Sequence, residues 1–391
     1  ESSLLLRSGK EPHLAASLIK RYQYAGNITC ATDGLCAIGC PVKIDTGKLI
    51  KKIREDEIGK NTAIAGWIAS HMDSVTSAAR AALDSVGFIR LLVGARVMKF
   101  LADGLRWTSG NRIPAWNRYM PLGASRIRVY NLRNGEKGRR GEKETGRGGD
   151  GENLDDRKVV YFPSCINRSM GLSHEQRGGR QLTEVMADLL RKGGYEVVYP
   201  AYLDKLCCGM AFSSKGYTEA GRKKSSELEA ALLKASGNGK YPVVCDMSPC
   251  LFTMRENIKS GLKLYEPVEF ILDHLSDRLD FNTLDETVTV FPVCSMKKMG
   301  LDGRLADLAR MCAARVIVAE TNCCGFAGDR GFTYPELNRH GLKDLRSQIP
   351  DGTVKGYSTS RTCEIGLSLN SGITYESIVY LADRASRSKI L

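Results

Sequence analysis

The segment YFPSCINRSMG at residues 161–171 recurs later in the chain as VFPVCSMKKMG at residues 290–300. The two segments share Phe, Pro, Cys, Met and Gly at matching positions. A second pair of segments follows in the same order, LCCGMAFSSKG at 206–216 and NCCGFAGDRGF at 322–332. Two motifs that recur in the same order indicate that one structural unit has been duplicated in tandem.

Each half closes with a third cysteine-containing segment, which is VVCDMSPC at 243–250 in the first half and GYSTSRTC at 356–363 in the second. The complete pattern of each half therefore contains three cysteine-containing segments in a fixed order. We predict a first unit at residues 158–286 and a second unit at residues 287–391.

Short β-branched runs alternate with helical patterns in both predicted units. The runs are KVVYF (158–162), EVVYP (196–200) and PVVCD (242–246) in the first unit, and TVTVF (287–291), RVIVAE (315–320) and TVKGYST (353–359) in the second. Strands that alternate with helices in this way are typical of parallel sheets. The predicted fold class of this region is therefore α/β, with parallel strands in each of two tandem units.

The cysteines of each unit follow directly after its predicted strands. The first set comprises Cys165, Cys207, Cys208 and Cys250, and the second comprises Cys294, Cys323, Cys324 and Cys363. Because ligands collect at the carboxyl ends of parallel strands, each set of four thiols should converge on one site. Two adjacent cysteines can serve one site only if the backbone turns, and Gly209 and Gly325 supply that freedom.

Four converging thiolates predict a metal or cluster site, and three readings of the pattern remain open. Structural zinc also takes four thiolates, but its usual pattern is two close C-x2-C pairs, whereas these cysteines are scattered. A buried or vicinal-disulfide pair would explain one Cys-Cys dipeptide, but not two matching sets. Iron–sulfur chemistry is the favoured reading. Cys245, which occurs only in the first unit, is either a fifth ligand of a larger cluster or a strand thiol.

The N-terminal region contains a third group of cysteines, Cys30, Cys36 and Cys40, of which the last precedes Pro41. The ferredoxin run C-x2-C-x2-C-x3-C-P matches this spacing, with Asp33 in its second slot. In that run the fourth cysteine binds the other cluster of a pair, so Cys40 should reach a different cluster from Cys30 and Cys36. Asp33 is either a carboxylate ligand of a 4Fe–4S cluster, the vacant corner of a 3Fe–4S cluster, or a turn aspartate before Gly34.

The rest of the N-terminal region has helical patterns, at 44–55 and through an Ala- and Leu-rich stretch at 60–109. We therefore predict a helical ferredoxin-like iron–sulfur domain at residues 1–130. Residues 131–157 are rich in Gly and in charges of both signs, which predicts a flexible linker or insertion.

The overall composition excludes several classes of protein. No stretch reaches the roughly 20 apolar residues of a membrane span, and no nucleic-acid motif accompanies the net charge of +13. No G-x-G-x-x-G follows a predicted strand, so we expect no NAD or FAD site on this chain. The odd count of 13 cysteines fits poorly with a secreted disulfide framework, and the N-terminus lacks the apolar core of a signal peptide. A reducing compartment, either cytoplasmic or mitochondrial, is expected.

Three stretches of this chain resemble one known family closely. RYQYAGNITCATDGLCAIGCPVKIDTGKLIK (21–51), together with TNCCGFAGDRGF (321–332) and STSRTCEIGL (358–367), resembles the C-terminal iron–sulfur portion of FAD-dependent D-lactate and related D-2-hydroxyacid dehydrogenases. The duplicated units are similar to the cysteine-rich CCG domains of heterodisulfide reductases and of glycolate oxidase iron–sulfur subunits. In the larger family an FAD domain and a further cysteine run precede this region, so the resemblance identifies the chain as a fragment or one part of a split polypeptide.

The resemblance implies electron transfer. Electrons would pass from FAD on an upstream domain or partner subunit, through iron–sulfur clusters on this chain, to a quinone, a cytochrome or an electron-transfer flavoprotein. Cys30, Cys36 and Cys40 would belong to the ferredoxin-like clusters, and the two four-cysteine sets to the CCG sites. The helical stretch at 60–109 would either contact the inner membrane peripherally or pack against the α/β units. The alternatives are a thiol–disulfide catalyst of the heterodisulfide reductase kind and a zinc-stabilised structural module; the sequence assigns no catalytic residue.

Overall fold

The N-terminal region is helical in the computed structural model, which describes residues 12–127 and 157–389. The predicted linker at 131–157 lies outside these ranges apart from its last residue. The elements of this region are α2 (Pro12–Tyr22), the π-helical turn η1 (Gln23–Ile28), α3 (Leu35–Gly39), α4 (Thr46–Ile58), α5 (Ala63–Ser70), α6 (Met72–Thr108) and the short strand β1 (Pro121–Gly123). The predicted helical patterns at 44–55 and 60–109 are confirmed.

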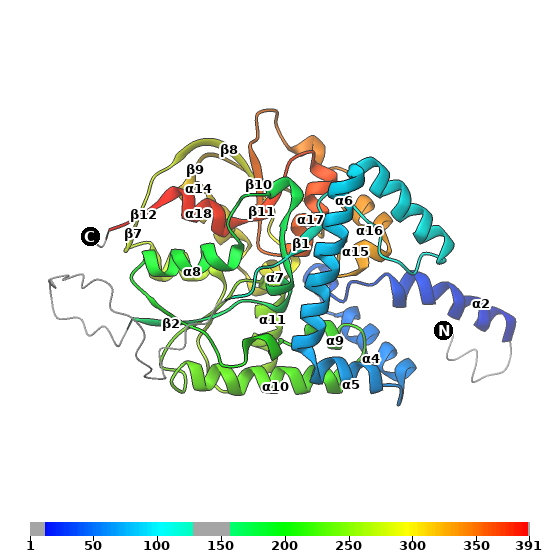
Figure 1. Ribbon diagram of the computed structural model, residues 1–391. Coiled ribbons are helices and arrows are strands. Elements are labelled where there is room, and N and C mark those ends of the chain that lie inside the picture. Colours follow the sequence, from blue (N-terminus) through cyan, green and yellow to red (C-terminus); the bar gives the residue numbers. More distant parts are fainter. Residues whose placement is uncertain (1–11, 128–156, 390–391) are drawn as a thin grey trace.

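Helix α6 consists of two segments that meet at a kink at Gly94, where φ is 78° and ψ is 164°. The segment before the kink packs against β1 and against the first α/β unit. The segment after the kink, the cyan helix of Figure 1, turns toward the second α/β unit, where Arg106 donates to the carbonyl oxygens of Phe332 and Thr333. No helix in the described ranges is both long and apolar enough to cross a membrane.

The first unit is built on a four-stranded parallel sheet in the order β4-β2-β5-β6. Its strands are β2 (Lys158–Phe162), β4 (Glu196–Val198), β5 (Val243–Cys245) and β6 (Leu264–Tyr265). Its helices are α7 (Cys165–Ser169), α8 (Leu182–Lys192), α9 (Met210–Ser213), α10 (Thr218–Ala235), α11 (Ser248–Asn257) and α12 (Pro267–Phe270), and the short strand β3 (Met170–Ser173) pairs with β1.

The second unit repeats this sheet, with its strands in the order β9-β8-β10-β11. Its strands are β8 (Leu284–Val290), β9 (Ala313–Val318), β10 (Lys355–Ser358) and β11 (Tyr375–Ser377). Its helices are α13 (Cys294–Met299), α14 (Asp302–Cys312), α15 (Arg330–Thr333), α16 (Pro335–Gly341), α17 (Arg361–Ser371) and α18 (Ile378–Ala385). The prediction of two tandem α/β units with parallel strands is thereby confirmed.

The two units share one hydrophobic core. Leu189 on α8 and Leu381 on α18 are fully buried members of the same apolar cluster, and α8 packs against α18 (Figure 1). The chain end closes this arrangement, because β12 (Ser386–Ser388) pairs antiparallel with β7 (Leu279–Phe281), the strand just before the second unit. Burial of apolar surface between the units therefore stabilises both sheets together.

Candidate metal centres

The first cysteine site begins where strand β2 ends. Pro163 follows the last strand residue, and Ser164 then caps α7 by accepting a hydrogen bond from the Asn167 N–H at 3.3 Å. Cys165 is consequently the first residue of α7, at the carboxyl edge of the sheet. The Sγ atoms of Cys165 and Cys207 lie 3.8 Å apart, although the two residues follow different strands.

The adjacent cysteines of the first unit join this site because the chain turns at Gly209. Gly209 has a φ of 86°, and a Cβ at this position would lie 2.3 Å from the carbonyl oxygen of Gly221. Only glycine fits such a conformation and such a close approach without strain. The Cys207 and Cys208 thiols contact each other, and Cys208 also contacts the Cys250 thiol in the first turn of α11. All four thiols predicted for this site are therefore brought together.

Cys245, the last residue of β5, lies in the same buried cluster as Cys208 and Cys250. It is fully buried, and its thiol makes only a weak hydrogen bond to the Met247 carbonyl oxygen, with a Sγ–O distance of 3.9 Å. Burial raises the pKa of the Cys245 thiol well above its usual range. The structure thus places a fifth thiol beside the four, as a ligand role would require.

The second site repeats the first at equivalent positions. Cys294 is the first residue of α13, after β8, and Cys363 lies in the first turn of α17, after β10. The Sγ atoms of Cys324 and Cys363 are 3.1 Å apart, and the Cys323 thiol contacts those of Cys294 and Cys324. The four predicted thiols converge here as well.

Gly325 makes the turn of the second site in the same way as Gly209 makes that of the first. Its φ is 67°, and a Cβ would lie 2.4 Å from the Leu337 carbonyl oxygen. Asn338 then fixes the turn by donating to the Cys324 carbonyl oxygen at 2.6 Å. The equivalent of Cys245 in this unit is Ser358, whose buried hydroxyl has no hydrogen-bond partner.

Each site offers four cysteine thiols, which are the ligands that iron–sulfur clusters commonly use. A contact with Cys207, followed by burial, raises the pKa of Cys165 well above its usual range. Such thiols ionise only when a positive metal compensates the cost of burying their charge. Four buried thiols are the donor set that an iron–sulfur cluster takes, and structural zinc takes the same set.

The N-terminal cysteines lie in the segment around α3. Arg54 of α4 holds the first of them by donating to the Cys30 carbonyl oxygen at 2.9 Å. Cys36 is exposed, and its hydrogen bond with the Thr46 hydroxyl, at 3.2 Å between Sγ and Oγ1, lowers its pKa. Cys40 follows α3 and is half-buried. The assembly of these three thiols into ferredoxin-like clusters stays a prediction.

Asp33 faces the second cysteine site. Its carboxyl interacts electrostatically with the Cys323 thiol, and it accepts a hydrogen bond from the Leu35 N–H at 3.2 Å. Burial, followed by the charge of Cys323, raises the pKa of Asp33 to about 6. Its assignment to a ferredoxin-like cluster stays a prediction, and the sequence carries no signal for its contact with Cys323.

A different part of the N-terminal region covers the first cysteine site. Ala65 and Ala69 on α5 form a small apolar cluster with Cys207 and Phe212, and Cys165 packs at its edge. The first site is therefore closed by apolar side chains, whereas a carboxyl group lies against the second.

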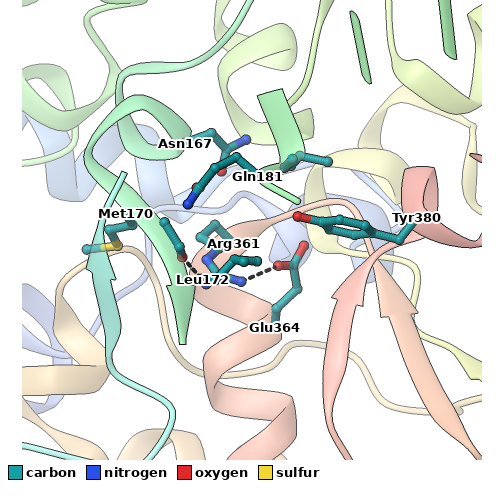
Figure 2. Close-up of a pocket in the computed structure, with 9 residues that line it drawn as sticks. Asn167, Met170, Leu172, Gln181, Arg361, Glu364 and Tyr380 are labelled. Atoms are coloured by element: carbon teal, nitrogen blue, oxygen red, sulfur yellow. Dashed lines mark hydrogen bonds and ion pairs between the residues drawn. The ribbon is translucent and has the colours of Figure 1, made fainter. Parts of the chain in front are cut away.

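A polar junction between the units was not predicted from the sequence (Figure 2). Arg361 on α17 donates to the Gly171 carbonyl oxygen of the first unit and pairs with Glu364, whose pKa is raised to about 7 by burial. A cavity of about 10 Å³ lies beside them, about the smallest that holds one water. Arg361 and Asn167 both line this cavity, and the buried atoms Arg361 Nε and Asn167 Oδ1 have no hydrogen-bond partner.

Comparison with known proteins identifies one domain of this chain. Residues 159–255 match the family model CCG, described as a cysteine-rich domain. The matched range contains all five cysteines of the first unit: Cys165, Cys207, Cys208, Cys245 and Cys250. The chain therefore carries a CCG cysteine-rich domain, which confirms the predicted similarity of its first α/β unit to CCG domains.

The relatives found include one subunit of the anaerobic glycerol-3-phosphate dehydrogenase of Escherichia coli strain K12. It is 24% identical over 245 residues, which cover 58% of this chain and 59% of the relative. Lactate utilization protein A of Oceanobacillus iheyensis is 25% identical over 212 residues, which cover 50% of this chain and 81% of that protein. The chain thus spans about three fifths of the length of the Escherichia coli relative.

Proposed function

We propose that this chain is the iron–sulfur electron-transfer portion of a multi-component dehydrogenase. The observation that carries the proposal is the pair of equivalent four-thiol sites, each built at the carboxyl edge of a parallel sheet. The similarity to a dehydrogenase subunit and to a lactate utilization protein supports it. A bound iron–sulfur cluster accepts and releases one electron at a time.

The chain's own residues hold such clusters and keep water from them. Cys165 and Cys207 bring two strand ends of the first unit to one point, and α5 covers them with alanine side chains. Cys324 and Cys363 do the same in the second unit. Cys250 and Cys363 lie in the first turns of α11 and α17. The positive end of each helix dipole is therefore near the thiolate and stabilises its charge.

The finer assignment follows from the family resemblance. We infer that the electron donor is FAD on another domain or subunit, that the substrate is a D-2-hydroxyacid such as D-lactate, and that the acceptor is a quinone, a cytochrome or an electron-transfer flavoprotein. We place the protein in a reducing compartment, cytoplasmic or mitochondrial. Its thirteen cysteines, which are all free, support that placement.

The first experiment measures iron, sulfide and zinc in anaerobically purified chain, with low-temperature EPR of the oxidised and dithionite-reduced states. We expect roughly eight or more irons, since two sites of four thiols each suit four-iron clusters, and EPR signals that appear on reduction. Stoichiometric zinc with silent EPR would contradict the proposal and favour a structural module. Turnover of a disulfide substrate that is lost on Cys208→Ser or Cys324→Ser would favour the thiol-catalyst alternative.

We also propose that the segment of α6 after the kink contacts an anionic membrane surface. Its exposed apolar side chains recur at helical spacing, and Phe100 is 79% and Trp107 82% exposed. Val97, Leu101 and Leu105 continue the same stripe. The net charge of +13 favours an anionic lipid surface as the occupant.

Co-sedimentation with vesicles tests this contact. We expect binding to vesicles that contain anionic lipid, weaker binding to zwitterionic ones, and loss of binding in Phe100→Ser/Leu105→Ser. Val354→Ser is the matched control, because Val354 is 51% exposed but lies in the second α/β unit. Equal binding by wild type and the double variant would contradict the membrane contact, and so would concentration-dependent dimerisation through this stripe.

A further inference from the structure

The N-terminal cysteine segment is attached to the second unit by several contacts. Helix α3 packs against α13, the helix that begins with Cys294. Arg330 of α15 donates to the Ile28 carbonyl oxygen at 3.0 Å, and the Tyr24 hydroxyl donates to Glu336 Oε1 at 3.0 Å. These contacts come from three separate elements, so they fix the segment over the second cysteine site.

The turn that carries Asp33 is shaped for this close approach. Gly34, the next residue, is buried and has a φ of 71°. A Cβ at Gly34 would lie 2.8 Å from Lys298 Nζ of α13 and 2.8 Å from Asp45 Oδ2. Glycine therefore lets the turn approach α13 so closely that the Asp33 carboxyl reaches Cys323.

The equivalent thiol of the first unit has a different environment. Cys207 is buried against Ala65 and Ala69, which offer it no polar group. Cys323 is half-buried and has the Asp33 carboxyl beside it. Two sites with four matched cysteines and the same strand order thus differ in what contacts one matched thiol.

From this placement, and on the basis of the proposed function, we propose that Asp33 is a positioning residue of the second cysteine site. It acts on the cluster there through Cys323, and it is not a ligand of a ferredoxin-like cluster. Hydrogen bonds and charges at cluster sulfurs set reduction potentials. Asp33 therefore gives the second site a potential different from that of the first, and it lies in the segment that links Cys30 and Cys36 to that site.

The test uses the full chain, purified anaerobically, with EPR and redox titration as readouts. The second-site signal is identified as the one lost in Cys324→Ser, the first-site signal as the one lost in Cys208→Ser, and the N-terminal signal as the one lost in Cys36→Ser. Asp33→Ala removes the contact with Cys323, and Asp33→Asn keeps a hydrogen-bonding group there. Asp45→Asn is the matched control, because it removes a nearby carboxylate while asparagine still caps α4.

We expect Asp33→Ala to change the g-values and midpoint potential of the second-site signal and to leave the first-site signal unchanged. Asp33→Asn should remain closer to wild type in g-values than Asp33→Ala, and Asp45→Asn should match wild type. A change confined to the N-terminal signal, no change at all, or an equal change in Asp45→Asn would overturn the proposal.

A second readout does not need iron and separates this proposal from the proposed function. In metal-free chain, the rate at which iodoacetamide alkylates each cysteine is measured by mass spectrometry. We expect Asp33→Ala to change the rate at Cys323 at least twofold and to leave the rate at Cys165 unchanged. An unchanged Cys323 rate would overturn the contact even if the clusters were present, whereas a changed rate in a chain that binds no iron would leave only the proposed function overturned.

Discussion

The two α/β units differ less in their scaffolds than in what covers them. Both use the same strand order, the same glycine turn after paired cysteines, and a last cysteine in the first turn of a helix. The first site is covered by α5, contains a fifth thiol at Cys245, and has alanine side chains packed against Cys207. The second has Ser358 in place of Cys245 and a carboxyl group beside Cys323. The N-terminal region, which contacts each unit with different side chains, makes two similar sites unequal.

Removing one thiol from either site should have the largest effect on iron content and on thermal stability. We expect Cys208→Ser and Cys324→Ser each to abolish the cluster of their own unit and to lower its melting temperature, since metal binding and folding are coupled. Iron content, EPR and thermal melting measure this. The control is Cys312→Ser, since Cys312 is buried in the core on α14, outside both sets, and should keep the full iron content. Unchanged iron content and an unchanged melting temperature in Cys324→Ser would contradict a cluster site in the second unit.

Substitutions at the two glycine turns should have the second largest effect, which is a loss of folding stability. Gly209→Ala and Gly325→Ala each place a Cβ within 2.4 Å of a carbonyl oxygen, at a positive φ. We expect each to destabilise the protein by about 2–4 kcal/mol through backbone strain and overpacking. Denaturant unfolding measures the loss. Gly303→Ala on α14 is the control, because it meets open space and should stabilise the helix by roughly 0.5–1 kcal/mol. A neutral effect at only one turn would mean that the two sites are not built alike.

The caps of two equivalent helices should differ in how their contribution to stability depends on pH. Glu266 caps α12 in the first unit, and Ser377 caps α18 at the corresponding place in the second. Burial raises the pKa of Glu266 from 4.5 to about 7, so the folded state binds this proton more tightly than the unfolded state. The stability that this proton contributes is fully present below pH 4.5 and is lost as pH rises through about 7.

Glu266→Gln should therefore lose less stability than wild type between pH 5 and 8, because glutamine does not titrate. Denaturant unfolding across this range is the measurement. Ser377→Ala should instead lose about 1 kcal/mol at every pH, as a missing helix cap does. Parallel pH profiles for wild type and Glu266→Gln would contradict the role given to Glu266.

The smallest effect is expected where the units differ by one buried atom. Ser358 has a buried hydroxyl without a partner, and Cys245 stands at the matching position. Ser358→Cys replaces that hydroxyl with a less polar thiol, and we expect a gain of up to about 1 kcal/mol. Cys245→Ser, the reverse exchange, should cost about 1–2 kcal/mol. Urea unfolding of both variants decides this; a loss of stability in Ser358→Cys would show that the position requires oxygen.

Most of the fold could be predicted from local patterns in the sequence. The strand runs before Cys165 and Cys294 form β2 and β8, and the helical patterns between the strand runs form helices such as α8 and α14. The convergence of each set of four thiols also followed, because strand ends in a parallel sheet share one edge. The kink at Gly94 could not be predicted, since nothing local distinguishes that glycine from Gly87, which stays helical.

The sequence by itself determined the duplicated α/β units, their parallel strands and the grouping of their cysteines, because these depend on short-range periodicity and on an internal repeat. Only the tertiary structure decided that Arg361 and Asn167 share a cavity between the units, and that α5 covers one cysteine site while the Asp33 turn covers the other. Those contacts join residues far apart in the chain. They depend on how preformed elements bury their surfaces against one another, which no local pattern of residues encodes.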